Sequence, residues 1–402
     1  MSQFASSIRS ACYLCLAGLV AAVPAFSQTV AYVYVESTNQ TGNSYIVEAY
    51  ATQANGRLNK IGSYPLLAIS SLIGGNGSYL FAAADGNPDE GIETNIDSYS
   101  VETNGGVGPR TESINVVSYA GSACNGASIQ SAVLDHTGHY LFVRIFNSEN
   151  GDCDQWQTYN VVSNGALNYL GSEKSPLIGY LETINPNNNF AYGTTEGSPC
   201  ASEGVQNAGP RFFPYSRNSA HDLSVDHNFT RADPGPDASS KYTLWASADP
   251  AEHLAVLMED CNNPNNVPAR IASYTINPTT GSIASTNTWS EMPETDVDTQ
   301  VPVNSQAPMF TDMSPSGKLL AVAGEGFQIF HFNGASPLTK FTSLQRGTDT
   351  IRQTAWDNSD HFYTLDFWDG ELRVFTVTPT SFSEDPGSPV NANGSAIVVV
   401  SK

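Results

Sequence analysis

Positively charged side chains are scarce in this sequence. Only 17 of the 402 residues are Lys or Arg, against 39 Asp and Glu, so the formal net charge is −22 although charged residues make up only 14% of the chain. Proteins that bind nucleic acid or anionic lipid rely on Lys and Arg to neutralise phosphate groups. The composition therefore argues against nucleic acid and against anionic membrane surfaces as partners.

Several other patterns are missing. No stretch keeps a hydrophobic period of about 3.6 residues, which predicts few helices. No Gly-x-Ser-x-Gly motif occurs, and the His residues do not assemble into a Ser-His-Asp triad. Hydrophobic residues still make up 40% of the chain, which is enough for a packed core.

Long apolar runs are absent except at the N-terminus. Arg9 is the only charged residue before Glu36, residues 11–23 are apolar, and Ala25-Phe26-Ser27 resembles a signal-peptidase cleavage site. A transmembrane anchor is the alternative, but the run is short and ends at Pro24. We therefore expect residues 1–27 to be a signal peptide and residues 28–402 to be exported, to the periplasm or the extracellular space. Loss of Arg9 makes the mature net charge −23.

Four of the six Cys residues remain after the signal: Cys124, Cys153, Cys200 and Cys261. None of them forms a Cys-x-x-Cys pair, so a thiolate zinc site is not expected. An even number of Cys in an oxidising compartment predicts two disulfides, for which three connectivities exist.

A turn followed by an apolar strand occurs six times. Asp135-His-Thr-Gly-His-Tyr140-Leu-Phe is typical of this pattern, in which turn-forming residues precede strand-forming ones. The six copies are residues 74–81, 135–142, 185–192, 249–256, 314–321 and 357–364.

A strand with a central aromatic residue, usually followed by a turn that contains Gly, occurs seven times. The aromatic residues are Tyr50, Tyr99, Tyr159, Tyr215, Tyr274, Phe330 and Phe375. Their spacing is about 54 residues, which indicates repeated structural units rather than several ordinary domains.

The two patterns together predict an all-β protein, a seven-bladed β-propeller with four-stranded antiparallel blades. In such a ring the C-terminal strand, residues 395–400, joins the N-terminal blade. The chain ends then replace one turn, which accounts for six turns among seven blades. A two-sheet sandwich with similar hairpins is the alternative.

These motifs resemble those of the seven-bladed lactonase-like propellers, a group that includes bacterial 6-phosphogluconolactonase-type proteins and related surface-repeat propellers. The resemblance covers nearly the whole mature chain and implies the propeller fold. Members of the group carry His-containing segments such as Gly-Pro-Arg-His. Here Gly108-Pro109-Arg110 and Gly209-Pro210-Arg211 are not followed by His, so no catalytic residue is transferred from the family.

In the propeller scheme, the four Cys residues lie near loops at one end of the ring. Cys124 and Cys153 belong to one blade, and Cys200 and Cys261 to neighbouring blades. We therefore predict Cys124–Cys153 and Cys200–Cys261 disulfides.

The loops at this end are also rich in acidic residues. Asp85, Asn87 and Asp89 alternate as in the opening of a calcium loop, although the expected Gly is Glu90 and the closing Glu is Ile96. Solvated acidic loops are the alternative. No cofactor is required by the sequence, and calcium is the one candidate.

Alignment of the innermost strands places a set of polar residues at positions that face the central channel. They are Gln130, Tyr180, Glu182, Thr311 and Arg352. Glu182 and Arg352 are the only charged members, which makes them candidates for general-base and anion-stabilising roles. A structural ion pair at the narrow end of the channel is the alternative.

The sequence thus predicts a monomeric binding module for a carbohydrate, a small molecule or an extracellular protein. Trp156 and Trp368, in or near the loops, suit sugar stacking, unless they belong to the core. A hydrolase of a sugar lactone that uses Glu182 and Arg352 is the alternative function, and a purely structural surface protein is a third hypothesis.

Overall fold

The computed structural model is built of β-strands. It describes residues 28–41, 44–67, 71–84, 94–121, 124–147, 153–174, 182–186, 190–195, 212–217, 223–225, 241–260, 268–298, 310–334 and 336–402. The expected signal peptide, residues 1–27, lies outside this part of the chain.

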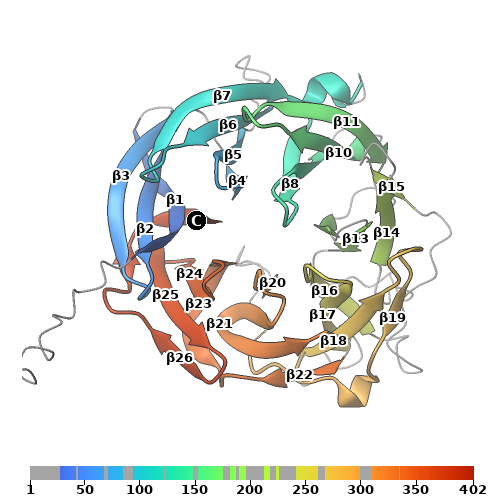
Figure 1. Ribbon diagram of the computed structural model, residues 1–402. Helices are drawn as coiled ribbons and strands as arrows, with labels where there is room; N and C mark the ends of the chain where they lie inside the picture. Colours follow the sequence, from blue (N-terminus) through green and yellow to red (C-terminus); the bar gives the residue numbers. More distant parts are fainter. Residues whose placement is uncertain are drawn as a thin grey trace, which may run out of the picture.

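The strands form five four-stranded antiparallel sheets and one eight-stranded sheet around a common centre (Figure 1). From the centre outward, the first sheet contains β28 (Gly394–Ser401), β1 (Thr29–Thr41), β2 (Ser44–Gln53) and β3 (Leu58–Leu67). In the same order, the second contains β4 (Ser71–Gly75), β5 (Tyr79–Ala84), β6 (Asn95–Val101) and β7 (Val107–Asn115), and the third contains β8 (Ser128–Leu134), β9 (Tyr140–Phe146), β10 (Asp154–Val161) and β11 (Leu167–Lys174). The fourth contains β12 (Glu182–Pro186), β13 (Phe190–Thr195), β14 (Phe212–Arg217) and β15 (Leu223–Val225), and the fifth contains β16 (Lys241–Ala248), β17 (His253–Asp260), β18 (Arg270–Ile276) and β19 (Ile283–Ser285).

The eight-stranded sheet contains β20 (Phe310–Met313), β21 (Leu319–Asn333), β22 (Ser336–Lys340), β23 (Gln345–Trp356), β24 (His361–Asp366), β25 (Glu371–Thr378), β26 (Ser381–Glu384) and β27 (Val390–Asn391). Helices in the described residues include two short 3₁₀ segments, Val116–Tyr119 and Trp289–Glu291. In the described part of the chain, no helix has the length and hydropathy needed to cross a bilayer.

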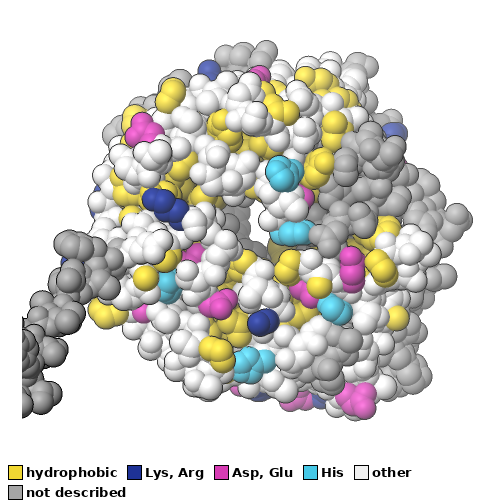
Figure 2. Space-filling model, in the orientation of Figure 1, with side chains coloured by type: hydrophobic (Ala, Val, Ile, Leu, Met, Phe, Trp, Pro, Cys, Tyr) yellow, Lys and Arg dark blue, Asp and Glu magenta, His cyan; other side chains and the backbone are white. Residues whose placement is uncertain are grey.

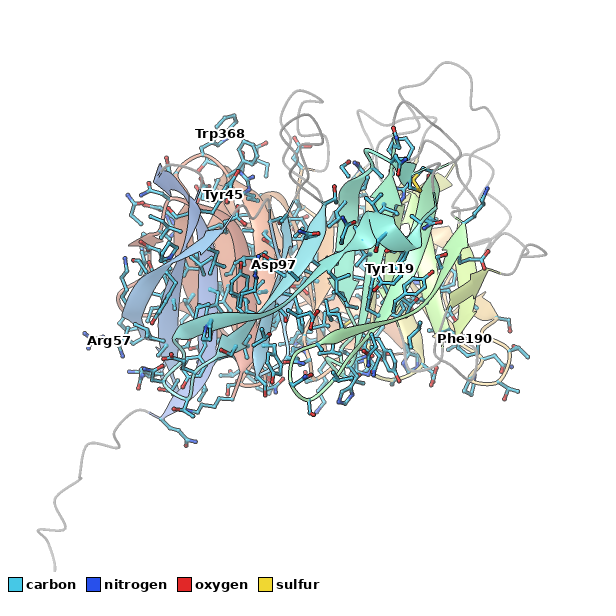
Figure 3. All side chains as sticks on the ribbon, turned by 90° about the horizontal axis from the view of Figure 1, so that it is seen from above. Tyr45, Arg57, Asp97, Tyr119, Phe190 and Trp368 are labelled. Atoms are coloured by element: carbon cyan, nitrogen blue, oxygen red, sulfur yellow. A yellow bond between two sulfur atoms is a disulfide. The ribbon has the colours of Figure 1, made fainter. Side chains whose placement is uncertain are left out.

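Both sequence repeats occupy fixed places in these sheets. The six turn-and-strand copies lie where the innermost strand of a sheet passes into the second strand. The seven aromatic residues lie in β2, β6, β10, β14, β18, β21 and β25. The turns between first and second strands define one end of the molecule, the turn end. The connections between second and third strands define the opposite loop end; Figure 3 shows Trp368 at the loop end and Arg57 at the turn end.

The last strand of the chain lies beside the first. β28 pairs antiparallel with β1, with Cα partners that run from Ala31 and Ser401 to Ser37 and Gly394. β28 is thus the innermost strand of the sheet that begins the chain.

The eight-stranded sheet arises from a chain reversal within β21. The Phe332 backbone N–H donates to the Lys318 carbonyl, so the two halves of β21 lie side by side. Gly326, between them, has φ +76°, and a Cβ there would lie 2.5 Å from the Gln345 carbonyl oxygen. This close approach requires glycine and lets β21 pair with β23, which joins two groups of strands into one sheet.

Neighbouring sheets are locked together by tyrosines of the second strands. The hydroxyl groups of Tyr34, Tyr79 and Tyr192 donate to the carbonyls of Gly105, Ser163 and Gly281 in the next sheet. A Cβ at Gly105 or Gly281 would clash with an aromatic ring of the preceding sheet. The glycine turns that follow the third-strand aromatics are therefore packing sites between sheets.

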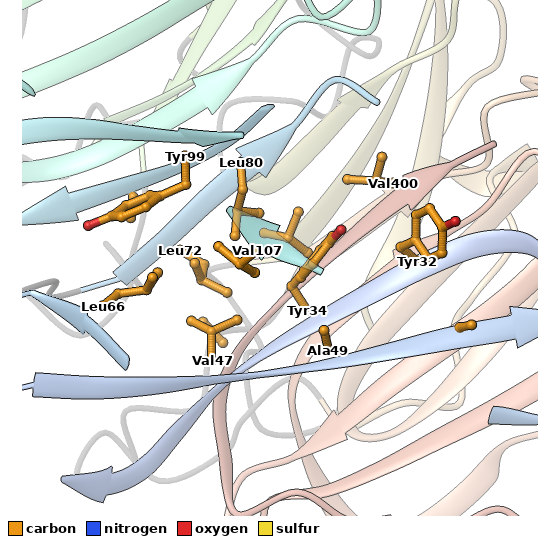
Figure 4. Packing of buried hydrophobic residues seen from close by; sticks show 14 residues of the cluster. Tyr32, Tyr34, Val47, Ala49, Leu66, Leu72, Leu80, Tyr99, Val107 and Val400 are labelled. Carbon is orange, nitrogen blue, oxygen red and sulfur yellow. The ribbon is translucent and has the colours of Figure 1, made fainter. Parts of the chain in front are cut away.

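The core consists of apolar layers between adjacent sheets. Figure 4 shows one layer, in which Tyr34, Val47 and Leu80, all completely buried, pack with Tyr99 and Val400. Burial of one such side chain contributes roughly 1.5–3 kcal/mol. The interior is thus divided among the sheet interfaces, and the centre of the molecule is left open.

Candidate functional site

A cavity of about 700 Å³ lies among the innermost strands at the turn end. Figure 2 shows this hollow at the centre of the molecule. Its described wall comes from β4, β8, β16, β20, β23 and β28 and the adjoining turns. Apolar wall residues include Ile73, Val133, Leu134, Met313, Ile397 and Val399, and polar ones include Asn76, Asp135, His136, Ser247, Asp312 and Thr354. The volume is within the range of small-molecule sites.

Asp312 places a carboxyl group on this wall. The Thr354 hydroxyl donates to Asp312 Oδ2 at 3.0 Å, and Trp356 Nε1 donates to the Asp312 backbone oxygen at 3.3 Å. Burial removes the carboxyl group from water and raises the pKa of Asp312 to about 7, and the hydrogen bond from Thr354 only partly opposes this effect. Asp312 is therefore suited to exchange a proton near neutral pH.

The carboxylates of the turns have structural roles. Asp135 Oδ1 accepts from the backbone N–H groups of His139 and Tyr140, each at 2.9 Å. Asp249 accepts from the backbone N–H of His253 at 2.9 Å, and its second oxygen lies 2.8 Å from His253 Nδ1. These bonds hold the turn between the first two strands of each sheet.

The corresponding pair in β23–β24 is completely buried. Asp357 accepts from the backbone N–H of His361 at 2.9 Å and lies 2.8 Å from its Nδ1. The Tyr363 hydroxyl lies within hydrogen-bonding distance of Asp357 and of Thr52 in the first sheet. Burial lowers the pKa of His361, but the hydrogen bond and charge of Asp357 and the charge of Asp385 outweigh it and raise the pKa above its ordinary value.

Thr311, predicted to face the channel, is directed into the sheet interface. It is buried, and its hydroxyl lies 2.8 Å from that of Ser247 in β16. Its neighbour Asp312 lines the cavity instead. Because side chains alternate along a strand, a shift of one residue exchanges the two faces.

Gln130 and Arg352 occupy β-bulges in their innermost strands. The pairing of β8 with β9 skips Gln130, and that of β23 with β24 skips Arg352. Gln130 is exposed and bonds to Ser128 at 2.8 Å. The Arg352 guanidinium carbon lies 5.1 Å from the centre of the Phe367 ring. Bulges redirect side chains and often lie beside functional sites.

Glu36, a residue not singled out from the sequence, links the first sheet to the sheet of β4 near Arg352. Its carboxylate accepts from the Leu72 backbone N–H and from the Ser395 hydroxyl, each at 3.0 Å. Burial raises the pKa of Glu36, although Ser395, Leu72 and the charge of Arg352 partly oppose the shift. The sequence signal that could have identified Glu36 is a single carboxylate within an apolar strand.

Trp368 is an exposed aromatic residue held in a fixed position at the loop end. Trp368 is 70% exposed and lies in the connection from β24 to β25. Its backbone N–H donates to Asp366 Oδ1 at 2.8 Å, and its Nε1 donates to the Thr350 hydroxyl at 3.2 Å. The Phe367 ring meets it edge-on at 4.8 Å between centres. The indole is thus oriented without being buried.

Trp156 differs from Trp368. It is only 1% exposed, so it packs in the interior and is not available for stacking on a ligand. This is the core role that the sequence left open for both tryptophans.

The structure contains a Cys124–Cys153 disulfide, which is the pairing predicted for this sheet. Cys200 and Cys261 lie outside the described residues, as do Tyr180 and the calcium candidates Asp85, Asn87 and Asp89. Glu182 begins β12, but its side chain lies outside the described part of the structure. Within that part, no group of three or more His, Cys, Asp and Glu residues is arranged to hold a metal ion.

A buried ion pair beside the disulfide was also missed. Arg144 Nε donates to Asp154 Oδ1 at 2.8 Å, and Nη2 donates to Oδ2 at 2.7 Å. The side chains are 2% and 1% exposed. Because charges in strands usually face solvent, the pattern gave no sign of this pair.

No known protein-family model matches the chain, and no curated protein matches its sequence significantly. Solved structures do match its fold. A protein from Lactobacillus plantarum has a TM-score of 0.60 at 12% identity, with 93% of this chain and 100% of the other covered. A protein from Bacteroides uniformis, provisionally described as a 6-phosphogluconolactonase, gives the same values. A periplasmic gluconolactonase from Pseudomonas aeruginosa covers 80% of this chain and 84% of its own, at 15% identity and a TM-score of 0.49. In fold, the chain resembles the lactonase-like β-propellers.

Proposed function

We propose that the chain is a secreted seven-bladed β-propeller that binds carbohydrate at its loop end. Seven third-strand aromatics and the pairing of β28 with β1 support a ring of seven blades closed by the chain ends. On this interpretation the eight-stranded sheet is two blades joined through β21 and β23. The disulfide supports export to an oxidising compartment.

The observation that carries the binding proposal is the fixed, exposed Trp368. An exposed indole that donates to Thr350 and is braced by Phe367 has little conformational freedom left to lose on binding. Rigid aromatic rings of this kind supply a large contact area at low entropic cost. The C–H faces of a sugar ring suit such a surface, and the anionic chain favours neutral sugars over acidic ones.

The test is a glycan array at micromolar protein, followed by titration of any hit. Trp368→Ala is expected to weaken binding about tenfold, the loss of one aromatic stacking contact and its buried area. Tyr119→Ala is the matched control, because Tyr119 is also an exposed aromatic (43%) but lies away from Trp368 (Figure 3). An array without hits, or equal losses in both variants, would refute the proposal.

Hydrolysis of a sugar lactone is a second candidate function. It is favoured by the fold likeness to the Bacteroides uniformis protein, and it would use Glu182 and Arg352. Because the chain carries a net charge of −22, an unphosphorylated lactone is a better candidate substrate than a phosphorylated one.

An assay of glucono-δ-lactone hydrolysis on the purified protein tests this second function. Loss of a general base is expected to reduce turnover on the order of 100-fold or more in Glu182→Gln. Turnover no faster than the buffer rate, or turnover unchanged in Glu182→Gln, would rule out the assignment.

A further inference from the structure

We infer that the cavity at the turn end binds a small organic cation, an amine whose ammonium group pairs with Asp312. This site lies at the end of the molecule opposite Trp368 and is independent of the proposed carbohydrate binding. The argument rests on the carboxyl geometry, the charges on the wall and the character of the remaining surface.

Asp312 has one carboxylate oxygen available to a ligand. Thr354 donates to Oδ2, and among the described residues Oδ1 has no hydrogen-bond partner. Trp356 and Thr354, both from β23, hold the backbone and side chain of Asp312 in place. The carboxyl group is therefore oriented on the cavity wall before any ligand arrives.

The described wall contains no Lys or Arg that neutralises this carboxylate. Its other titratable residues are Asp135 and His136. Asp135 is committed to its turn, where it accepts from His139, Tyr140 and Thr137. Removing a carboxylate from water without a counter-charge costs free energy. A cationic ligand offsets this desolvation cost by pairing with the carboxylate.

The remaining wall favours an organic cation over a metal ion. Ile73, Val133, Leu134 and Met313 give the wall of the same cavity apolar surface, and Trp356 also lines it. Calcium or magnesium requires six or more oxygen ligands, which one open carboxylate oxygen does not provide. An ammonium group needs one anionic acceptor, and its carbon skeleton suits the apolar wall.

Binding should depend on pH through Asp312. β20 packs against β16, β17, β21 and β23. The residues of β16, β21 and β23 that face it, Ser247, Ala321 and Thr354, do not titrate. At the β16–β17 turn, Asp249 and His253 are paired with each other. Because burial raises the pKa of Asp312 to about 7, the ionised form that accepts an ammonium group dominates above that pH and is lost below it.

The experiment is calorimetric titration of the full mature chain with phenethylamine, n-hexylamine and choline, with 2-phenylethanol as the uncharged counterpart. At least one amine is expected to bind at pH 8, and its affinity should fall up to tenfold for each pH unit below 7. Asp312→Asn should abolish binding. His136→Gln should leave the pH profile unchanged, which assigns the pH dependence to Asp312 and not to the histidine on the same wall.

Two further variants keep the test decisive. If Asp312→Asn fails to fold, Thr354→Val removes the donor to Oδ2 and should shift the pH profile upward. Trp368→Ala should not affect amine binding, which separates this inference from carbohydrate binding. Three outcomes would overturn the proposal: absence of binding by all three cations at 10 mM and pH 8 (about the weakest affinity worth assigning to a site), equal binding of 2-phenylethanol, or unchanged binding by Asp312→Asn.

Discussion

Replacement of Arg144 by methionine isolates the energetic role of the buried ion pair with Asp154. The two side chains lie on the adjacent strands β9 and β10 and are joined by two charge-assisted hydrogen bonds of 2.8 and 2.7 Å. Methionine keeps most of the volume of the arginine stem but offers no donor. The variant therefore leaves a carboxylate in an interior position without its main partner.

The expected loss of stability depends on whether Asp154 stays charged or takes up a proton. Removal of one partner of a buried ion pair destabilises a protein by about 3–5 kcal/mol. Asp154 escapes this penalty by taking up a proton, and protonation of a carboxyl of ordinary pKa, about 3.9, costs about 4 kcal/mol at pH 7 but only about 1.5 kcal/mol at pH 5. The loss of stability in Arg144→Met is therefore about 4 kcal/mol at pH 7, and it decreases as the pH falls.

Urea unfolding at pH 7 and pH 5 measures this loss. The double variant Arg144→Met/Asp154→Leu, which removes both charges, should recover most of the stability of the parent at pH 7, because no unpaired charge remains. A loss below 1 kcal/mol at pH 7 (the usual size for an exposed pair), or a loss of equal size at both pH values, would refute the reasoning.

Three further predictions concern stability. Cys124→Ala/Cys153→Ala removes a link across 29 residues of chain and should cost about 3–4 kcal/mol in urea unfolding, and an unchanged midpoint would contradict it. His361→Gln should destabilise most at pH 5.5 and least at pH 9. The raised pKa of His361 means that its contribution is complete below about pH 6.5 and is lost as the pH rises through the folded-state pKa, so a melting-temperature difference that does not vary with pH would argue against a charged His361. Deletion of β28 should abolish the cooperative thermal transition by removing the innermost strand beside β1, and a variant that melts within a few degrees of the parent would contradict this role.

The sequence was sufficient to locate strands and turns because their signals are local. The turn residues of 135–142 specify a reversal, and the aromatics at Tyr50, Tyr99 and Tyr159 lie in third strands as expected. Glycine turns also provide packing space between sheets. At Gly281 the absence of a Cβ leaves room for Phe190 of the neighbouring sheet.

The candidate site was harder to predict because it depends on register. Bulges at Gln130 and Arg352 break the alternation that the sequence alignment assumed. In β20 the alignment selected Thr311, whereas Asp312, one residue later, lines the cavity. The burial of Trp156 and of the Arg144–Asp154 pair is decided by packing between distant segments, which no local pattern records.

The contact between the two ends of the chain has a consequence for the order of folding. Ser395 bonds to Glu36 across 359 residues of sequence, so the first sheet is incomplete until nearly the whole polypeptide has been made. Until then β1 has only β2 as a neighbour and presents an unpaired edge. Contacts between such distant segments form slowly, which prolongs the lifetime of aggregation-prone folding intermediates. The eight residues of β28 thus determine when the edge of β1 is covered and the nascent chain becomes less prone to aggregation.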